Sequence, residues 1–143
     1  MFREIGDQVG EATAFNNLAG VHRGRGDIVT SLACYTHALA VFQSVGDRAA
    51  EARVLNNIGL IHYDKSEFKA ALECYERARK LQRLTGDKAS EAATLANIGL
   101  VLSDSGDRDE ALDYYNQALS TFRSLGDPAG EAAVVSNMQA LRD

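Results

Sequence analysis

The chain has 143 residues, 45% of them hydrophobic, with a formal net charge of −5 and a single proline. This length allows one domain with a packed core, and the composition argues against disorder. No run of Lys and Arg suggests a nucleic-acid partner, and no apolar stretch approaches the ~18 residues that a membrane span needs. Two cysteines are too few for a disulfide scaffold. We therefore expect a cytoplasmic protein that binds neither membranes nor nucleic acids.

Several short motifs recur with a period of 40 residues. Gly-Asp occurs at 6–7, 46–47, 86–87 and 126–127, and Glu-Ala follows at 11–12, 51–52, 91–92 and 131–132. One asparagine column keeps the same period: Asn17, Asn57, Asn97 and Asn137. Several independent marks that share one period indicate a repeat architecture.

The Gly-Asp pairs predict the helix boundaries. Gly suits the left-handed position just after a helix, and Asp caps the start of the next helix. A further Gly-Asp lies at 26–27 and at 106–107, with Ser66-Glu67 at the corresponding place in the middle unit. Asp107 with Glu110 also matches a capping box. Each 40-residue unit is therefore predicted to hold two helices.

In chain order, the predicted helices span 8–24, 28–45, 48–64, 67–84, 88–104, 108–125 and 128–142. Residues 2–5 match 42–45 and 122–125, so they are interpreted as the tail of a preceding second helix. The predicted domain 1–143 contains units at 8–45, 48–84 and 88–125, with partial units at 1–6 and 128–143. This arrangement suggests a segment of a longer array.

The apolar and small residues of the units carry a family resemblance. The second unit has Leu55, Ile58-Gly59, His62, Ala71, Tyr75 and Ala78, and the third has Leu95, Ile98-Gly99, Leu102, Ala111, Tyr115 and Ala118. The pattern resembles the tetratricopeptide repeat (TPR), in the long form found in kinesin light chains, Pins-like proteins and bacterial regulatory proteins. The first unit departs from it at Ala19 and Ser31. The resemblance implies an all-α, right-handed α-solenoid of antiparallel helix pairs, whose first helices line a peptide-binding groove.

Helical rotation places a set of mainly polar residues opposite the buried side of the first helices. The predicted groove residues are Thr13, Asn16, Arg23, Arg53, Asn56, Leu60, Tyr63, Asp64, Ser103 and Asp104, with Asn17, Asn57, Asn97 and Asn137 on the flank. An asparagine amide can hold a peptide backbone, or it can bond a neighbouring helix and fix the repeat spacing. Arg23 and Arg53 could meet a partner's carboxylate or phosphate, or pair with Asp64 or Glu51. We further expect a polarised groove, positive at Arg23 and negative at Asp104.

Other reactive residues receive structural interpretations. His22 and His62 hold equivalent positions and are expected to pack in the core rather than bind metal. Cys34 and Cys74 are expected to stay separate, as buried thiols. No nucleophile–base set, phosphate-binding loop or dinucleotide motif is present in the sequence. No enzyme activity, cofactor or metal is therefore expected.

The resemblance favours a scaffold that binds a protein or peptide partner in the groove. Two alternatives remain open: a ligand-sensing regulatory segment of a multidomain signalling protein, and a self-assembling structural module. The last helix carries Val134, Val135, Met138 and Leu141 with no following helix to cover them. Exposed solenoid ends favour association, so weak self-association through the ends is also expected.

Overall fold

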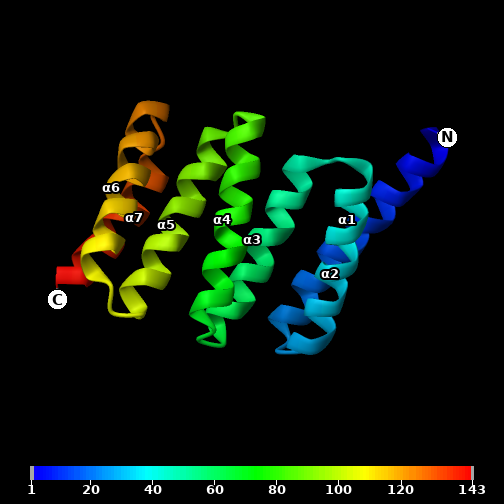
Figure 1. The fold of residues 1–143 in the computed structure, drawn as a ribbon, viewed down its shortest axis with the longest axis horizontal. Helices are drawn as coiled ribbons and strands as arrows, with labels where there is room; N and C mark the ends of the chain where they lie inside the picture. Colours follow the sequence, from blue (N-terminus) through cyan, green and yellow to red (C-terminus); the bar gives the residue numbers. More distant parts are fainter. Residues whose placement is uncertain (1, 143) are drawn as a thin grey trace.

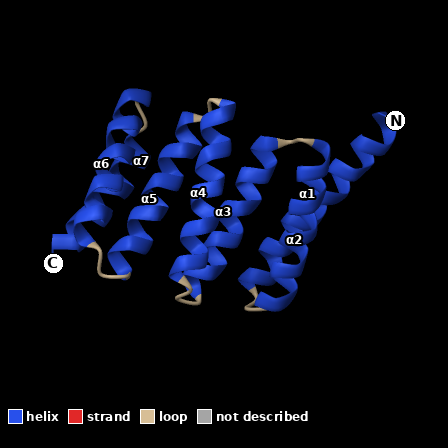
Figure 2. Cartoon of the chain, viewed as in Figure 1, coloured by secondary structure: helices blue, strands red, loops and turns tan. Residues whose placement is uncertain are grey.

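The computed structural model describes the backbone of residues 2–142 and the side chains of residues 6–141. Within this range the chain forms helices joined by short turns and contains no strand (Figures 1 and 2). The helices are α1 (Phe2–Gly24), α2 (Ile28–Val45), α3 (Arg48–Asp64), α4 (Phe68–Thr85), α5 (Lys88–Asp104), α6 (Arg108–Leu125) and α7 (Pro128–Arg142).

The helices form a solenoid of consecutive pairs. We call α1, α3, α5 and α7 the first helices, and α2, α4 and α6 the second helices. Helices α1, α3 and α5 each pack on the second helix that follows, and each second helix also contacts the next first helix. The pairs succeed one another along the long axis of the molecule (Figure 1). The predicted all-α repeat solenoid is confirmed.

Glycine and aspartate terminate and start the helices as expected at most junctions. Gly46, Gly86 and Gly126 adopt φ of 75°, 74° and 67°, the left-handed conformation that glycine adopts without strain. Asp87 accepts a hydrogen bond from the backbone N–H of Ser90, 3.2 Å from Asp87 Oδ1, and the other first-helix caps of this kind are Asp47 and Asp127. The turn chemistry read from the sequence therefore sets these junctions.

The predicted capping box at Asp107 is wrong. The Asp107 side chain makes no capping hydrogen bond to α6. It instead lies beside Glu110, and a shared hydrogen bond together with the nearby negative charge raises the pKa of Glu110.

The first predicted turn is also absent. Gly6 and Asp7 lie inside α1, which runs without interruption from Phe2, so residues 2–5 do not form a separate helical tail. Gly and Asp permit a turn but do not enforce one. At the later junctions, a second helix packs against the next first helix and fixes the turn. Within the described residues, α1 has no such helix before it.

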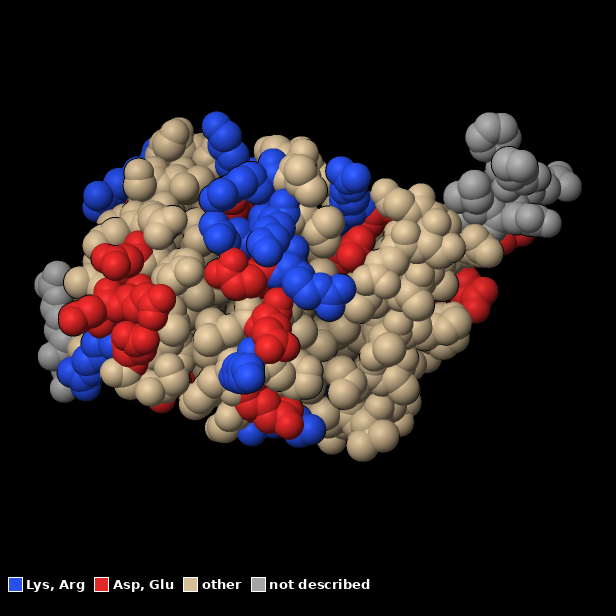
Figure 3. Space-filling view, in the orientation of Figure 1, with Lys and Arg blue, Asp and Glu red and all other residues tan. Residues whose placement is uncertain are grey.

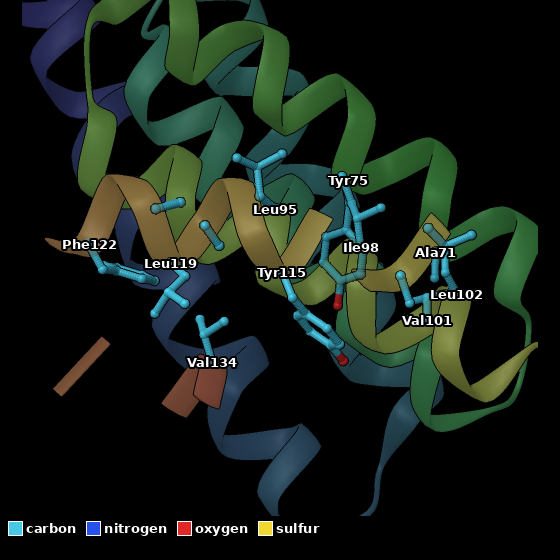
Figure 4. Close-up of a cluster of buried hydrophobic side chains, with 13 residues drawn as sticks. Ala71, Tyr75, Leu95, Ile98, Val101, Leu102, Tyr115, Leu119, Phe122 and Val134 are labelled. Carbon is cyan, nitrogen blue, oxygen red and sulfur yellow. The ribbon is translucent and has the colours of Figure 1, made fainter. Parts of the chain in front are cut away.

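Aromatic rings packed on glycine hold the pairs α3–α4 and α5–α6 together. A Cβ at Gly59 would lie 2.8 Å from Cε1 of Tyr75, and one at Gly99 would lie 2.7 Å from Cε1 of Tyr115. Both tyrosines are buried, and Figure 4 shows them within the cluster that also holds Ile98 and Val101. The Gly–Tyr contact is the packing that the repeat pattern predicts. In the first unit, Ala19 and Tyr35 are likewise buried.

Helix α2 is unusually apolar for this solenoid. Its 18 residues, Ile28–Val45, contain no Asp, Glu, Lys or Arg and have a mean hydropathy of 1.4, enough by length and composition to cross a membrane. We expected from the sequence that no apolar stretch would be long enough to span a membrane, and the composition of α2 contradicts this expectation. In the structure α2 packs between α1 and α3, with Cys34, Tyr35, Ala38 and Phe42 buried. Figure 3 shows few Lys, Arg, Asp or Glu side chains over the right-hand part of the view, where Figure 1 places α1 and α2.

The histidines are not core residues, which corrects their sequence-based interpretation. His22 and His62 are half-buried, and each faces an acidic residue five positions later. His62 Nδ1 lies 2.9 Å from Glu67 Oε1, and this hydrogen bond lowers the pKa of Glu67. The acidic side chain is within reach because it starts the next helix, directly after the turn.

The cysteines stay separate, as predicted. Cys34 and Cys74 are both free thiols. Cys34 is buried, whereas Cys74 is only half-buried, in contrast to the expectation that both are buried. Partial burial raises the pKa of the Cys74 thiol. Equivalent side chains in successive units lie too far apart to bridge, because a helix layer separates them.

Candidate functional site

The predicted groove residues lie on the first helices, and several of them bind one another across units. Arg23 Nη2 donates to Asp64 Oδ2 at 2.8 Å, which links α1 to α3. At the equivalent place one unit later, the Tyr63 hydroxyl donates to the carboxylate of Asp104 and links α3 to α5. Burial, followed by this hydrogen bond, raises the pKa of Tyr63 to about 12.

These two contacts between units change the charges that the groove residues present to a partner. They form because residues 41 positions apart lie side by side on adjacent first helices. The pair with Asp64 offsets the positive end of the expected gradient, whereas Asp104 keeps its negative charge because the hydroxyl that donates to it is neutral. The gradient along the whole groove stays a prediction.

The asparagines divide into two groups. Asn57 Nδ2 lies 3.4 Å from Asn16 Oδ1, and Asn56 Nδ2 donates to the Thr94 hydroxyl at 3.0 Å. These contacts join neighbouring first helices. They give a structural role to Asn57 of the flank column, and also to Asn16 and Asn56, which were predicted to face the groove. Asn97 and Asn137 instead line an open cleft between α5 and α7.

The bond from Asn56 continues into the interior. The buried Thr94 hydroxyl lies 2.8 Å from Oε1 of the buried Gln82, so a polar chain runs from α3 through α5 to the end of α4. The chain gives the buried Gln82 amide oxygen a hydrogen-bond partner. The exposed part of Asn56 still faces a pocket of about 250 Å³ between α3 and α5, lined by Ala49, Arg53, Asn56, Gln82, Thr85, Asp87 and Ser90.

Arg53 is the exposed cation of this α3–α5 pocket. The acidic groups considered as its partners are occupied elsewhere: Glu51 accepts from Gln43, and Asp64 accepts from Arg23. Its guanidinium is therefore directed to the pocket and solvent. This is the chemistry that can meet a partner's carboxylate.

A second cavity, larger than the α3–α5 pocket, lies one unit later, between α5 and α7. This α5–α7 cleft has a volume of about 470 Å³ and is lined by Ala89, Ser90, Ala93, Ala96, Asn97, Phe122, Asp127, Gly130, Ala133, Val134 and Asn137. Its walls are mainly small and apolar, with the two asparagine amides 40 positions apart on adjacent helices. Such a cleft can take an apolar side chain while the amides hold the backbone on either side.

Substitutions at equivalent positions explain why this cleft is open and apolar. The polar chain of Asn56, Thr94 and Gln82 corresponds, 40 residues on, to Ala96, Val134 and Phe122. Ala96 lacks the amide side chain with which Asn56 bridges α3 and α5 in the earlier unit. Gly130 then lets α7 approach Phe122, because a Cβ there would lie 2.5 Å from the ring.

The remaining predicted groove residues take lesser roles. The Thr13 hydroxyl donates to the Val9 carbonyl 2.8 Å away, within its own helix. Leu60 and Ser103 are half-buried, and Asn17 is exposed. None of these three lines either of the two cavities described above.

Sequence reasoning missed much of the α5–α7 cleft. Phe122, Gly130, Ala133 and the alanines of α5 carry no chemical motif. A usable signal was present: comparing each position with the residue 40 places earlier shows polar side chains replaced by small or apolar ones. Within the described residues, no group of three His, Cys, Asp or Glu side chains is placed to hold a metal ion.

Comparisons with known proteins agree with this architecture. The sequence matches the tetratricopeptide repeat family over residues 10–83 and 52–124. BtubC (BKLC) from P. vanneervenii has a similar structure, with a TM-score of 0.75 and 26% identity over 80% of this chain and 48% of BtubC. This chain thus spans about half the length of that protein. No curated protein matches the sequence.

Two further solved structures share the fold. The N-terminal domain of stress-induced protein-1 (STI-1) from C. elegans has a TM-score of 0.74 and 20% identity, covering 95% of this chain and 98% of that domain. Aspartyl phosphate phosphatase F from Bacillus subtilis has a TM-score of 0.78 and 14% identity over 94% of this chain and 40% of its own length. With the family match across three successive units, this chain belongs to the tetratricopeptide repeat family.

Proposed function

We propose that this TPR protein is a scaffold that binds a peptide segment of a partner protein along its first helices. The TPR fold generally supports protein–protein interaction, and the family is typically not enzymatic. The observation that carries the proposal is the α5–α7 cleft, where Asn97 and Asn137 flank small apolar walls. The neighbouring α3–α5 pocket adds the exposed Arg53.

The two cavities together define the peptide chemistry. The bound segment places an apolar side chain in the α5–α7 cleft, with its backbone amides bonded to the two asparagines. An acidic residue of the same segment meets Arg53 one unit away. This division supplies both apolar burial and a charge-assisted contact, the combination found at binding hot spots.

The test is a selection from a displayed random-peptide library on the immobilised full chain. Enriched peptides should combine an apolar with an acidic residue. Ala93→Trp, which fills the cleft, should abolish their binding, and Asn97→Ala and Asn137→Ala should each weaken it by about 3–10-fold for one lost hydrogen bond. Ala33→Trp, at an exposed position of α2, is the matched control. Enriched peptides that bind the Ala93→Trp variant normally would place the binding surface elsewhere.

A further inference from the structure

A third cavity opens between the second helices α4 and α6. We call it the α4–α6 pocket. It has a volume of about 490 Å³ and shares no lining residue with the α3–α5 pocket or the α5–α7 cleft. The nearly buried Leu95 of α5 forms its floor, and Arg83 of α4 and Thr121 of α6 stand at its sides. The pocket therefore belongs to the second-helix side of the solenoid and is separate from the groove of the first helices.

The equivalent space one unit earlier is filled by leucines. There Leu39 and Leu81 pack on Leu55, in one small apolar cluster. Forty residues on, Leu55 corresponds to Leu95 and Leu81 corresponds to Thr121. The shorter, polar threonine leaves the floor of the α4–α6 pocket accessible from outside.

Arg79, which stands at the position equivalent to Leu39, is held away from this space. Its Nε and Nη2 donate to Glu76 Oε2 at 3.3 and 3.1 Å, and the Tyr114 hydroxyl donates to Glu76 Oε1 at 3.3 Å. Arg79 does not line the pocket. The polar contacts between α4 and α6 thus keep a long side chain from covering Leu95.

Arg83 is the cation of the pocket, and its orientation is fixed by an acidic neighbour. Its Nε donates to Glu91 Oε2 at 3.1 Å, and within the described residues its two terminal nitrogens have no hydrogen-bond partner. A guanidinium already held through Nε loses less conformational freedom when a ligand binds the other two nitrogens. Those nitrogens form the planar pair of donors that suits a carboxylate.

The α6 wall supplies hydrogen-bonding groups without charge. Asn116, Gln117 and Ser120 line the pocket at positions where the preceding unit has three charged residues. Glu91 is the single acidic residue of the lining, and it is paired with Arg83. Helix α4 carries five basic and two acidic residues in a chain of net charge −5, and Figure 3 shows Lys and Arg gathered over its upper part. This local charge favours an anionic ligand.

We propose that the α4–α6 pocket is a second binding site, which takes an aspartate or glutamate side chain of a peptide segment. The carboxylate accepts from the terminal nitrogens of Arg83, and the aliphatic part of the side chain covers Leu95. The amides of Asn116 and Gln117 bond the adjoining peptide backbone, since each offers both a donor and an acceptor. The site has its own walls, so the proposal does not depend on binding in the groove.

The test uses the blocked tripeptide acetyl-Gly-Glu-Gly-amide as a probe of the full chain. Binding is followed by nuclear magnetic resonance, through the side-chain amide signals of Asn116 and Gln117, at constant ionic strength. These signals report on this pocket alone, so binding at Arg53 would not be mistaken for it. They should shift and saturate with the Glu probe, whereas the neutral acetyl-Gly-Gln-Gly-amide should bind at least about tenfold more weakly for want of a charge-assisted hydrogen bond.

Two variants test the proposed contacts. Arg83→Gln should weaken binding of the Glu probe by at least about tenfold. Thr121→Leu should abolish it without lowering the melting temperature, because the leucine covers Leu95 as Leu81 covers Leu55 one unit earlier. Arg123→Gln is the matched control, since Arg123 Nε pairs with Glu131 at 2.8 Å in the same way but lies outside the pocket, and it should bind normally.

Three results would overturn the proposal. The first is an absence of saturable shifts with the Glu probe, and the second is equal binding of the Glu and Gln probes. The third is normal binding by a folded Thr121→Leu chain. Glutarate, a free dicarboxylate, is the last comparison: tighter binding of glutarate than of the tripeptide would assign the pocket to a small acid and overturn its assignment to a peptide.

Discussion

Ser66 occupies a backbone conformation that its residue type disfavours. Its φ is 60°, while the matching turns at 26 and 106 have glycine with φ of 82° and 93°. A left-handed conformation costs a residue with a Cβ about 1–2 kcal/mol, and glycine gives back part of this as chain entropy. We predict that Ser66→Gly raises the free energy of unfolding by about 0.5–1 kcal/mol, measured by urea denaturation. A decrease would indicate an unrecognised side-chain role for Ser66.

Gly99 is required by a neighbouring ring rather than by its backbone conformation. A Cβ there would lie within 2.8 Å of two ring atoms of the buried Tyr115. Gly99→Ala should therefore lower the free energy of unfolding by about 1–3 kcal/mol, because overpacking outweighs the gain in helix propensity. The measurement is chemical denaturation monitored by circular dichroism.

Gly20 supplies the matched control for this prediction. A Cβ at Gly20 would meet only the Tyr35 hydroxyl oxygen, at the ordinary distance of 3.7 Å. Gly20→Ala should consequently stabilise α1 by about 0.5–1 kcal/mol through helix propensity alone. If both alanine variants shifted stability in the same direction, ring contact would not be the reason for Gly99.

At the scale of helices, adjacent first helices are held together by side chains that reach across a unit. Asn56 is the example with the deepest connection, since it bonds Thr94, which bonds Gln82. We predict that Asn56→Ala lowers the free energy of unfolding by about 1 kcal/mol, the typical value for one hydrogen bond of this kind. Thermal and urea denaturation would measure it.

Arg53→Ala is the control for the same pocket. Arg53 is exposed, and such surface substitutions usually change stability by less than about 0.5 kcal/mol. An Asn56→Ala variant as stable as Arg53→Ala would show that the hydrogen bond from Asn56 to α5 contributes nothing to the stability of the fold. The two substitutions thus separate a structural from a binding role within one pocket.

For the whole molecule, the buried Tyr115 and the partly buried Tyr63 make stability sensitive to alkaline pH. Burial, aided by nearby carboxylates, raises the pKa of Tyr63 and of Tyr115 to about 12, above the value of about 10 expected in an unfolded chain. A raised pKa means that the folded state holds the proton more tightly. This stabilisation is present in full below pH ~10 and is lost as pH rises towards ~12.

We therefore expect the melting temperature to fall between pH ~10 and ~12, with tyrosinate absorbance appearing at the unfolding transition. Tyr63→Phe should reduce the slope of melting temperature against pH, because the substitution removes one hydroxyl whose pKa is raised in the folded state. A slope identical to that of the unmodified chain would show that Tyr63 does not contribute to this loss. The solenoid makes such effects local, since each unit contacts only its neighbours.

The sequence by itself determined the repeat, the helices and most of the turns. These features depend on local chemistry: glycine tolerates a left-handed turn, Asp caps the next helix, and glycine opposite tyrosine allows close packing. Each acts over a few residues or over one helix pair, so the pattern along the chain is sufficient. The positions of the predicted groove residues on the first helices followed from the same helical period.

Only the tertiary structure decided what those residues contact. Asn57 and Asn97 hold equivalent positions, yet Asn57 contacts Asn16 while Asn97 borders an open cleft. Gly-Asp forms a turn at 46–47 but lies within a helix at 6–7. In each case the outcome depends on a side chain or helix contributed from about 40 residues away, at a position where successive units differ. Side-chain partners are set by packing between units, which no local pattern encodes.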